Sequence, residues 1–233
     1  MLKSTFPFIS KDLTFDESYH VYKHKGVKFL NVTTWLSKMD TPFDAYEVSE
    51  KVSKMPDSEY YGMNPAEIHQ LWKDTAMRGN KKHKSIERWL KEESANCDEM
   101  IFLHDLGINP KTSWSEIPLM SESLQLAGTA DIITIKDNEY FFWDIKTCKK
   151  VDDAKLKKFS MQIMTYCVLL WEMTKGSISI NPGGIILIEP KDDLSKGITS
   201  DFNPPVLLNI DHSVNDILIN AIKKRRKYIK GQR

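Results

Sequence analysis

The chain has 233 residues, of which 41% are hydrophobic and 28% charged, and it carries a formal net charge of +1. This length suits one α/β domain with a full core, and the near-neutral charge means that any contact with nucleic acid must come from local patches. Because the sequence has no long apolar run, no typical secretory signal and only three scattered cysteines, we expect an intracellular protein without a membrane partner or disulfide framework.

The first third of the chain predicts a hairpin that is followed by helices. Asn64-Pro65 is a typical helix start, because asparagine caps free amides and proline fits the first turn. Gly79 is expected to break or bend the helix that begins there. The predicted elements are strands over residues 13–22 and 27–32, and helices over 33–39, 42–54, 64–77 and 82–93.

The remaining two thirds predict strands separated by long helices. One strand pair is apolar on both faces, with Ile132 and Trp143 on one face and Ile133 and Phe142 on the other. Such a pair needs helices on both sides, so we expect an α/β fold with a mixed central β-sheet. The predicted elements are strands over 117–126, 130–135, 140–145, 184–189 and 206–210, and helices over 154–174 and 214–230.

That strand pair also carries the most informative residues, Asp131 on one strand and Asp144-Ile145-Lys146 on the other. If Asp137-Asn138 form a two-residue turn, Asp131 falls opposite Asp144, and Lys146 shares the face of Asp144. Opposed like charges destabilise a sheet unless a cation lies between them, and a divalent metal with oxygen ligands is the natural candidate. The pattern therefore predicts a metal-dependent nuclease.

Companion residues occur before and after this pair. His83 and Glu87 are one helical turn apart, and so are Gln162 and Tyr166 on the long helix over 154–174. Glu116 lies on the strand that leads into the site, where it either orients a ligand or pairs with a lysine.

Taken in order, Gly79…His83…Glu87, Gly128-x-x-Asp131, Asp144-x-Lys146 and Gln162-x-x-x-Tyr166 resemble the RecB-like branch of the PD-(D/E)XK nuclease superfamily. The opening hairpin is also similar to that of phage and mitochondrial genome-maintenance exonucleases. The resemblance implies a restriction-endonuclease-like core with a helical N-terminal elaboration. We therefore expect a single nuclease domain over 1–233, in which 1–77 form the N-terminal hairpin and helical elaboration and 78–233 the catalytic core and C-terminal helix.

The resemblance also implies roles for individual residues. Asp131, Asp144 and the main-chain carbonyl of Ile145 would bind one or two Mg²⁺ or Mn²⁺ ions, with His83 as a further ligand. Lys146 would position or deprotonate the attacking water. Gln162 and Tyr166 would border the site and contact DNA or steady the lysine. Further expected roles are catalysis for Glu87, contact with DNA for Arg78 and Lys149, and support of the ligands for Glu116 and Gly128. Relatives with an iron–sulfur cluster use four cysteines, so we expect no cluster here.

Several positions have structural alternatives. Glu87 could pair with Lys84 and Lys91 on its own helix, and Gln162 and Tyr166 could be boundary residues of an amphipathic helix. The basic run Lys223 to Lys227 could bind DNA or complement a helix dipole.

For the whole protein we expect an exonuclease that acts on single-stranded DNA or a duplex end, in recombination, replication or repair. The alternatives are a structure-selective endonuclease, a non-catalytic DNA-binding module and a small-molecule phosphoesterase.

Overall fold

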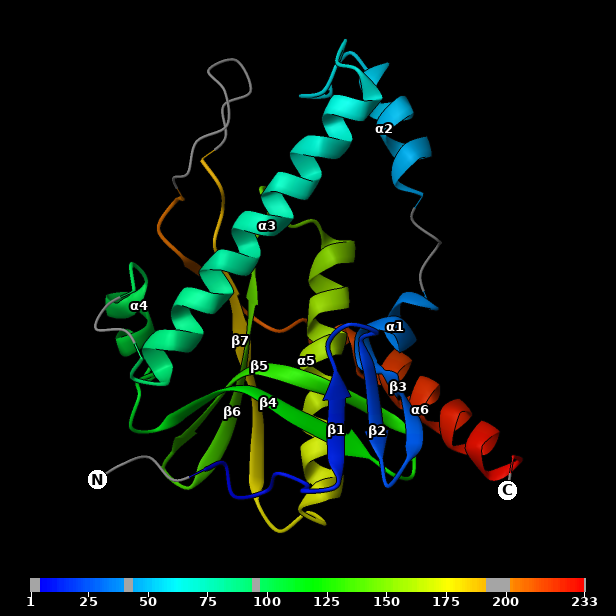
Figure 1. Ribbon diagram of the computed structural model, residues 1–233, viewed down its shortest axis with the longest axis vertical. Coiled ribbons are helices and arrows are strands. Elements are labelled where there is room, and N and C mark those ends of the chain that lie inside the picture. Colours follow the sequence, from blue (N-terminus) through cyan, green and yellow to red (C-terminus); the bar gives the residue numbers. More distant parts are fainter. Residues whose placement is uncertain (1–4, 40–43, 94–96, 192–201, 233) are drawn as a thin grey trace.

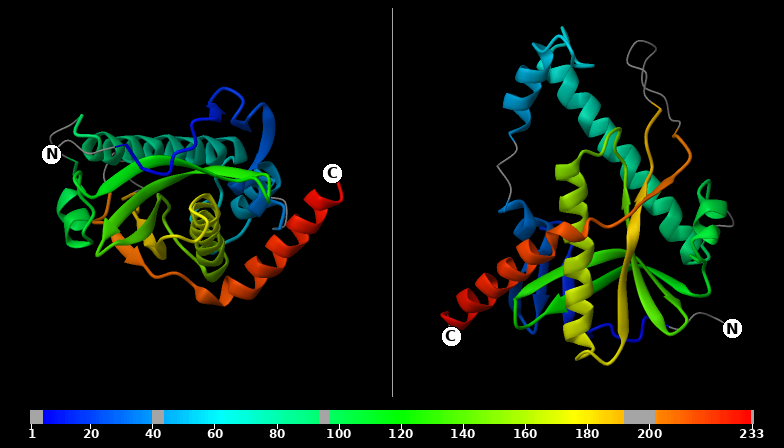
Figure 2. Two further views of the ribbon diagram at one scale, coloured as in Figure 1. Left: turned by 90° about the horizontal axis from the view of Figure 1, so that it is seen from below. Right: turned by 180° about the vertical axis from the view of Figure 1, so that it is seen from behind.

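The computed structural model describes residues 5–39, 44–93, 97–191 and 202–232. In this part of the chain a mixed sheet of eight strands forms the centre, and α3 and α5 cover its opposite faces (Figure 1, Figure 2). No helix in the described ranges is both long and apolar enough to cross a membrane. The predicted α/β class with a mixed, helix-flanked sheet is confirmed.

The sheet has the strand order β1-β2-β3-β5-β6-β7-β8, and β4 pairs with β5 outside this path. The pairs β3–β5 and β6–β7 are parallel, and the other pairs are antiparallel. The strands are β1 (Leu13–Asp16), β2 (Val21–His24), β3 (Val27–Asn31), β4 (Ser113–Ser121), β5 (Leu126–Lys136), β6 (Glu139–Lys146), β7 (Ser179–Leu187) and β8 (Val206–Leu208).

The helices connect these strands and supply the two outer layers. Helix α2 packs on α3, and both reach beyond the sheet at the end where β6 finishes (Figure 1). The helices are α1 (Val32–Ser37), α2 (Ala45–Ser53), α3 (Pro65–Leu90), α4 (Met100–Asp105), α5 (Asp153–Met173) and α6 (Asn215–Lys230), with a 3₁₀ turn η1 (His212–Val214) before α6.

The β5–β6 hairpin has the predicted register. Lys136 pairs with Glu139 across the turn, and the ladder continues to Ile132 and Trp143. Ile133 and Phe142 are buried in a cluster with α5, whereas Ile132 and Trp143 are buried in a second cluster with α3. Burial on both faces fixes the register, because a slip of one residue would exchange the two faces of the strand.

Two predicted strands differ in extent from the observed ones. The stretch 13–22 is a tight hairpin of β1 and β2 rather than one strand, because the chain reverses at residues 17–20, where His20 has a φ of 51°. The stretch 117–126 spans the end of β4, a turn and the start of β5. Neither turn contains glycine, so the sequence gives little sign of it.

Three helices also differ from prediction. Helix α3 is continuous through Gly79 because this glycine is buried against Thr147, and close packing outweighs its poor helix propensity. Helix α1 begins at Val32 rather than at residue 33, because Asn31 caps it: the Asn31 Oδ1 accepts a hydrogen bond from the Thr33 amide at 2.8 Å. The short helix α4 was not predicted from the sequence.

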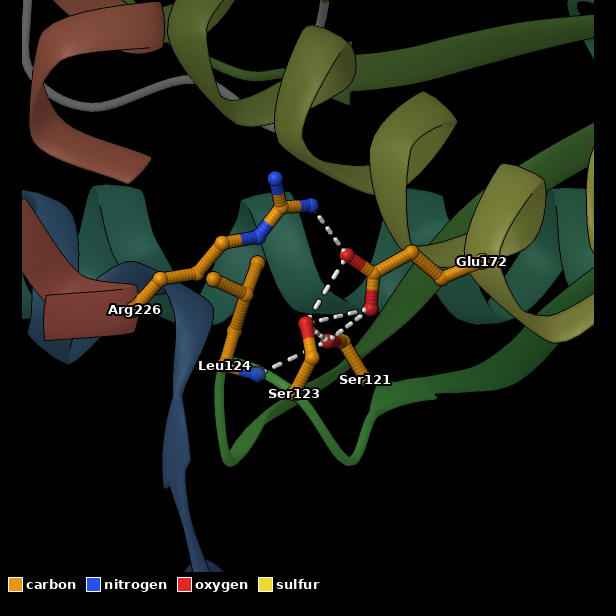
Figure 3. Close-up of polar contacts among 5 residues, drawn as sticks. All are labelled: Ser121, Ser123, Leu124, Glu172 and Arg226. Atoms are coloured by element: carbon orange, nitrogen blue, oxygen red, sulfur yellow. Dashed lines mark hydrogen bonds and ion pairs between the residues drawn. The ribbon is translucent and has the colours of Figure 1, made fainter. Parts of the chain in front are cut away.

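A partly buried carboxylate joins three elements at the far end of α5. Glu172 accepts hydrogen bonds from Ser121, the last residue of β4, and from Ser123 in the turn that follows, and it forms an ion pair of 2.6 Å with Arg226 of α6 (Figure 3). Burial by itself raises the pKa of Glu172, but the hydrogen bonds from Ser121, Arg226 and Ser123 outweigh it, and the net pKa is lowered.

We predict that Glu172→Gln lowers the free energy of unfolding by about 1–2 kcal/mol at neutral pH, because it removes charge-assisted hydrogen bonds. Because the folded state lowers this pKa, the stabilisation is complete above the ordinary glutamate pKa of 4.5 and is lost as pH falls through the folded-state value. Denaturant unfolding from pH 7 to pH 3 measures the difference. The exposed Glu93→Gln is the control, and a difference that grows toward acid pH would contradict the assignment.

Candidate metal and catalytic site

Three carboxylates lie at the same level on three adjacent strands. Ser115 pairs with Ile132 and Ile117 with Ala130, so Glu116 of β4 falls opposite Asp131 of β5. On the other side the β5–β6 ladder ends at Ile132 and Trp143, and the next residues are Asp131 and Asp144. The predicted register is thus confirmed as far as Ile132 and Trp143, and its continuation by one step places Glu116, Asp131 and Asp144 in a row across the sheet.

Glu116 has an unusual backbone. Its φ of 53° lies in the left-handed region, which is uncommon for a residue other than glycine and costs about 1–3 kcal/mol. Glu116 itself is absent from the ladder, although its neighbours on both sides pair with β5. This local bulge directs the Glu116 carboxylate toward Asp131 and His83.

His83, Glu116 and Asp131 form a group of possible metal ligands. One ligand atom from each lies within 4.8 Å of the others, and His83 Nδ1 is 3.6 Å from Asp131 Oδ2. Burial raises the pKa of Glu116 to about 7, and the negative charges of Asp131 and Glu87 add to this effect. A cation would relieve this repulsion, and two carboxylates with one imidazole suit Mg²⁺ or Mn²⁺. The residues present therefore fit a divalent metal.

The backbone of β6 orients Asp131. The amide of Ile145 donates a hydrogen bond of 2.8 Å to Asp131 Oδ2, where the backbone ladder between the two strands has ended. This contact fixes the carboxylate at the edge of the ligand group. The carbonyl of Ile145, predicted as a metal ligand, stays a prediction.

Asp144 and Lys146 form a pair beside this group. Lys146 Nζ lies 2.7 Å from Asp144 Oδ2, and Asp144 is only 2% exposed. Asp144 Oδ1 is buried and has no hydrogen-bond partner within the described ranges. Burial raises the pKa of Asp144 to about 7 in spite of the lysine. Burial lowers the pKa of Lys146, but the charges of Asp144 and Asp131 raise it by more, so the lysine is protonated.

Helix α5 supports Lys146 from the other face. Lys146 Nζ donates to Gln162 Oε1 at 3.2 Å, and Gln162 Nε2 donates to the Tyr166 hydroxyl at 3.4 Å. Tyr166 is only 4% exposed, which favours the expected alternative that it steadies Lys146 through Gln162, and its contact with DNA stays a prediction. Its burial follows from packing against the sheet face that carries Ile133.

Two glycines allow the helices to approach the site. A Cβ at Gly128 would lie 2.8 Å from Cε1 of Tyr166, and one at Gly79 would lie 3.0 Å from Cβ of Thr147, which follows Lys146. Larger residues at these positions would push α5 or α3 away from the strands that carry the carboxylates. This is the physical basis of the supporting role expected for Gly128.

The ligand group opens into a cleft of about 570 Å³ between α3, β4 and the β1–β2 hairpin. Glu87 lines this cleft and forms ion pairs of 2.5 Å with Lys91 and 3.7 Å with Lys84, as the structural alternative predicted. Its catalytic role stays a prediction, since Glu87 is outside the group of His83, Glu116 and Asp131.

The two basic residues predicted to contact DNA lie on α3 and in the loop that follows β6. Arg78 is half-buried on α3 and donates to Thr75 Oγ1 at 3.2 Å. Lys149 lines a second cleft of about 430 Å³ together with Tyr60 and Trp72, and it pairs with Glu59 at 2.7 Å. The involvement of Trp72 was not predicted, because only the packing of α3 over the 147–150 loop places it there.

A group of possible acidic metal ligands beside a lysine on the neighbouring strand suits metal-dependent hydrolysis. The family model of the PD-(D/E)XK nuclease superfamily matches residues 46–228, and the chain belongs to this superfamily. Membership indicates a nuclease that acts on nucleic acid with divalent metal ions.

Comparison with other proteins adds little detail. No curated protein matches the sequence. Among solved structures, one titled "Crystal structure of SSO0001" is similar, with 13% identity and a TM-score of 0.32 over 82% of this chain and 81% of that chain.

We predict that Gly128→Ala lowers the free energy of unfolding by about 1–3 kcal/mol, because the added methyl group overlaps the Tyr166 ring. Thermal unfolding measures this loss. Gly231→Ala is the matched control, since a Cβ there meets only ordinary contacts at 3.6 Å. An unchanged melting temperature in Gly128→Ala would contradict the tight contact between β5 and α5.

Proposed function

We propose that the protein is a metal-dependent DNA exonuclease that hydrolyses phosphodiester bonds from a DNA end. The observation that carries this proposal is the carboxylate row, which lies beside a lysine on one side and His83 on the other. Such a site combines metal ligands with a group able to hold the attacking water.

The metal would be Mg²⁺ or Mn²⁺, as one or two ions. Asp131 and His83, which form one group with Glu116, would hold it. Asp144, which lies outside that group, and the carbonyl of Ile145 would complete the ligand set. When bound, the ion would lower the pKa of a water molecule and neutralise charge on the scissile phosphate.

Lys146 would orient the attacking water with its ammonium group. Gln162 and Asp144 hold that group in place, since it lies 3.2 Å from the amide oxygen and 2.7 Å from the carboxylate. The negative field of the carboxylates keeps Lys146 protonated without metal, and a bound cation would weaken that field. Proton removal by Lys146 therefore becomes easier only in the loaded site.

The helical elaboration supports action at a DNA end. Helix α2 and the first half of α3 rise above the end of β6 that carries Lys146 (Figure 1). The cleft between the start of α3, the loop before it and the 147–150 loop combines Tyr60 and Trp72 with the basic residues Lys149, Lys150 and Lys155. Aromatic rings beside cations are typical of single-strand binding, which favours a free end over a closed duplex. An exonuclease of this kind would serve recombination, replication or repair, where it would act with partner proteins.

We predict that wild-type protein releases nucleotides stepwise from one end of linear DNA with Mg²⁺ or Mn²⁺, and that EDTA, Lys146→Ala or Asp131→Asn abolishes release. Substrates labelled at the 5′ or the 3′ end give the polarity. The control is Lys158→Ala at an exposed position, which removes the same positive charge as Lys146→Ala but should retain activity.

A covalently closed circle separates the remaining alternatives. Cutting of the circle would identify a structure-selective endonuclease. Binding of DNA without cleavage under either metal would identify a non-catalytic binding module, and hydrolysis of simple phosphate esters alone would identify a phosphoesterase.

We predict that Glu116→Gln weakens metal binding without lowering the stability of the fold. Removing one charged ligand raises the Mn²⁺ concentration for half-maximal cleavage about tenfold or more, within the 10- to 100-fold range that ligand-supporting changes cause. The same change relieves like-charge repulsion with Asp131, so thermal stability without metal is expected to stay equal or rise. An unchanged Mn²⁺ dependence would exclude Glu116 from the metal site.

A further inference from the structure

A groove beside α6 is not used by the proposed reaction. It consists of two adjoining hollows of about 670 Å³ and about 440 Å³, whose walls share Lys38, Arg225 and Tyr228. Helices α1 and α6 form the first hollow, and strands β2 and β3 close the second against the end of α6 (Figure 1). We call the two hollows together the α1–α6 groove.

The charge of this groove is one-sided. Lys28, Lys38, Lys224 and Arg225 line it, and its described lining residues include no aspartate or glutamate. The whole chain is nearly balanced, with 33 lysines and arginines against 32 acidic residues. A local group of cations in a balanced protein attracts a polyanion to that place rather than to the surface in general.

The groove also presents aromatic surface next to these cations. Tyr19 is 80% exposed and Tyr228 is 56% exposed, and Trp35 forms part of the wall on α1. Unpaired bases stack on such rings, whereas the bases of a duplex are already stacked on one another. The combination of rings and cations therefore fits a single strand better than a duplex.

The basic run on α6 divides between two tasks. Arg225 donates to the carbonyls of Leu124 and Gln125 at 2.9 and 3.3 Å, and Arg226 pairs with Glu172 (Figure 3). These two arginines anchor the helix to the body of the protein. Lys224 and Tyr228 are one helical turn apart and both line the groove.

The groove and the cleft that contains the metal ligands both have lining residues at the β1–β2 turn. Phe15 and Glu17 line the cleft that contains the metal ligands, while Tyr19 and His20 line the groove. The turn between β1 and β2 thus separates the two surfaces by only a few residues. A strand that leaves the cleft across this turn would enter the groove directly.

We propose that the α1–α6 groove binds single-stranded DNA beyond the bond that is cut, an inference that rests on the proposed nuclease function and extends its substrate contacts. The groove would hold the strand during successive cleavage steps, since its cations contact phosphates and its rings contact bases.

The test uses binding without cleavage, in EDTA and with Asp131→Asn. The probe is a fluorescein-labelled oligothymidylate of about 20 nucleotides, longer than a typical single-strand site. Lys38→Glu with Lys224→Glu is compared by anisotropy with Lys223→Glu with Lys227→Glu, which makes the same charge change on exposed residues of α6 that do not line the groove.

We expect the groove pair to bind at least about tenfold more weakly, and its salt dependence to fall by about 1.4 in log–log slope, because two phosphate contacts are lost. The control pair should stay within about twofold of the parent in affinity. Tyr228→Ala should weaken binding about tenfold without changing the slope, since it removes stacking rather than charge. Circular dichroism verifies that each variant is folded.

Three results would overturn the groove assignment: no binding by the parent, no loss in the groove pair, or an equal loss in both pairs. Failure of the nuclease proposal would be recognised by a different result, the absence of cleavage by wild-type protein. The binding assay does not depend on cleavage. In an active protein, the groove pair should slow cleavage of the long substrate and leave a substrate of about four nucleotides unchanged.

Discussion

The site depends on holding three carboxylates side by side at one level of a β-sheet. Glu116, Asp131 and Asp144 lie on adjacent strands, and like charges so placed repel one another. Lys146 compensates for this on one side, where its ammonium pairs with Asp144. Burial raises the pKa values of Glu116 and Asp144, and the charge of Asp131 raises both further. A divalent cation would relieve this like-charge repulsion.

The surrounding fold can be understood from this constraint. Helix α3 must come close enough for His83 to reach Asp131, and Gly79 allows that approach at Thr147. Helix α5 must come close enough for Gln162 to reach Lys146, and Gly128 allows that approach at Tyr166. The burial and backbone strain in the site cost stability, while the two apolar clusters on either face of β5 and β6 offset that cost.

The sequence predicted the centre of this arrangement because its rules are local. A two-residue turn fixes which residues of a hairpin face each other, and a spacing of four on a helix places Gln162 beside Tyr166. The backbone of Glu116 could not be predicted in this way, since nothing in the sequence indicates a left-handed residue within a strand. The burial of Tyr166 likewise depends on which face of α5 meets the sheet.

Other differences between the predicted and the observed elements also arise from tertiary packing. Gly79 suggested a helix break, but its contact with Thr147 keeps α3 continuous. The sequence allowed two interpretations of the basic run on α6. In the structure Arg226 pairs with Glu172, and Arg225 donates to the carbonyls of Leu124 and Gln125. Only the position of α6 against α1 shows which of its side chains line the α1–α6 groove, among them Arg225, which also anchors the helix.

The position of a bound metal ion tests most directly whether the carboxylate row is a metal site. Crystals of the wild-type protein soaked in Mn²⁺ can be measured by anomalous scattering, which locates the ion independently of activity. We expect an anomalous peak at about 2–2.3 Å from carboxylate oxygens of Asp131 and Glu116, with His83 nearby. A peak elsewhere, or none at a concentration that supports cleavage, would contradict the central claim that the carboxylate row is a metal site.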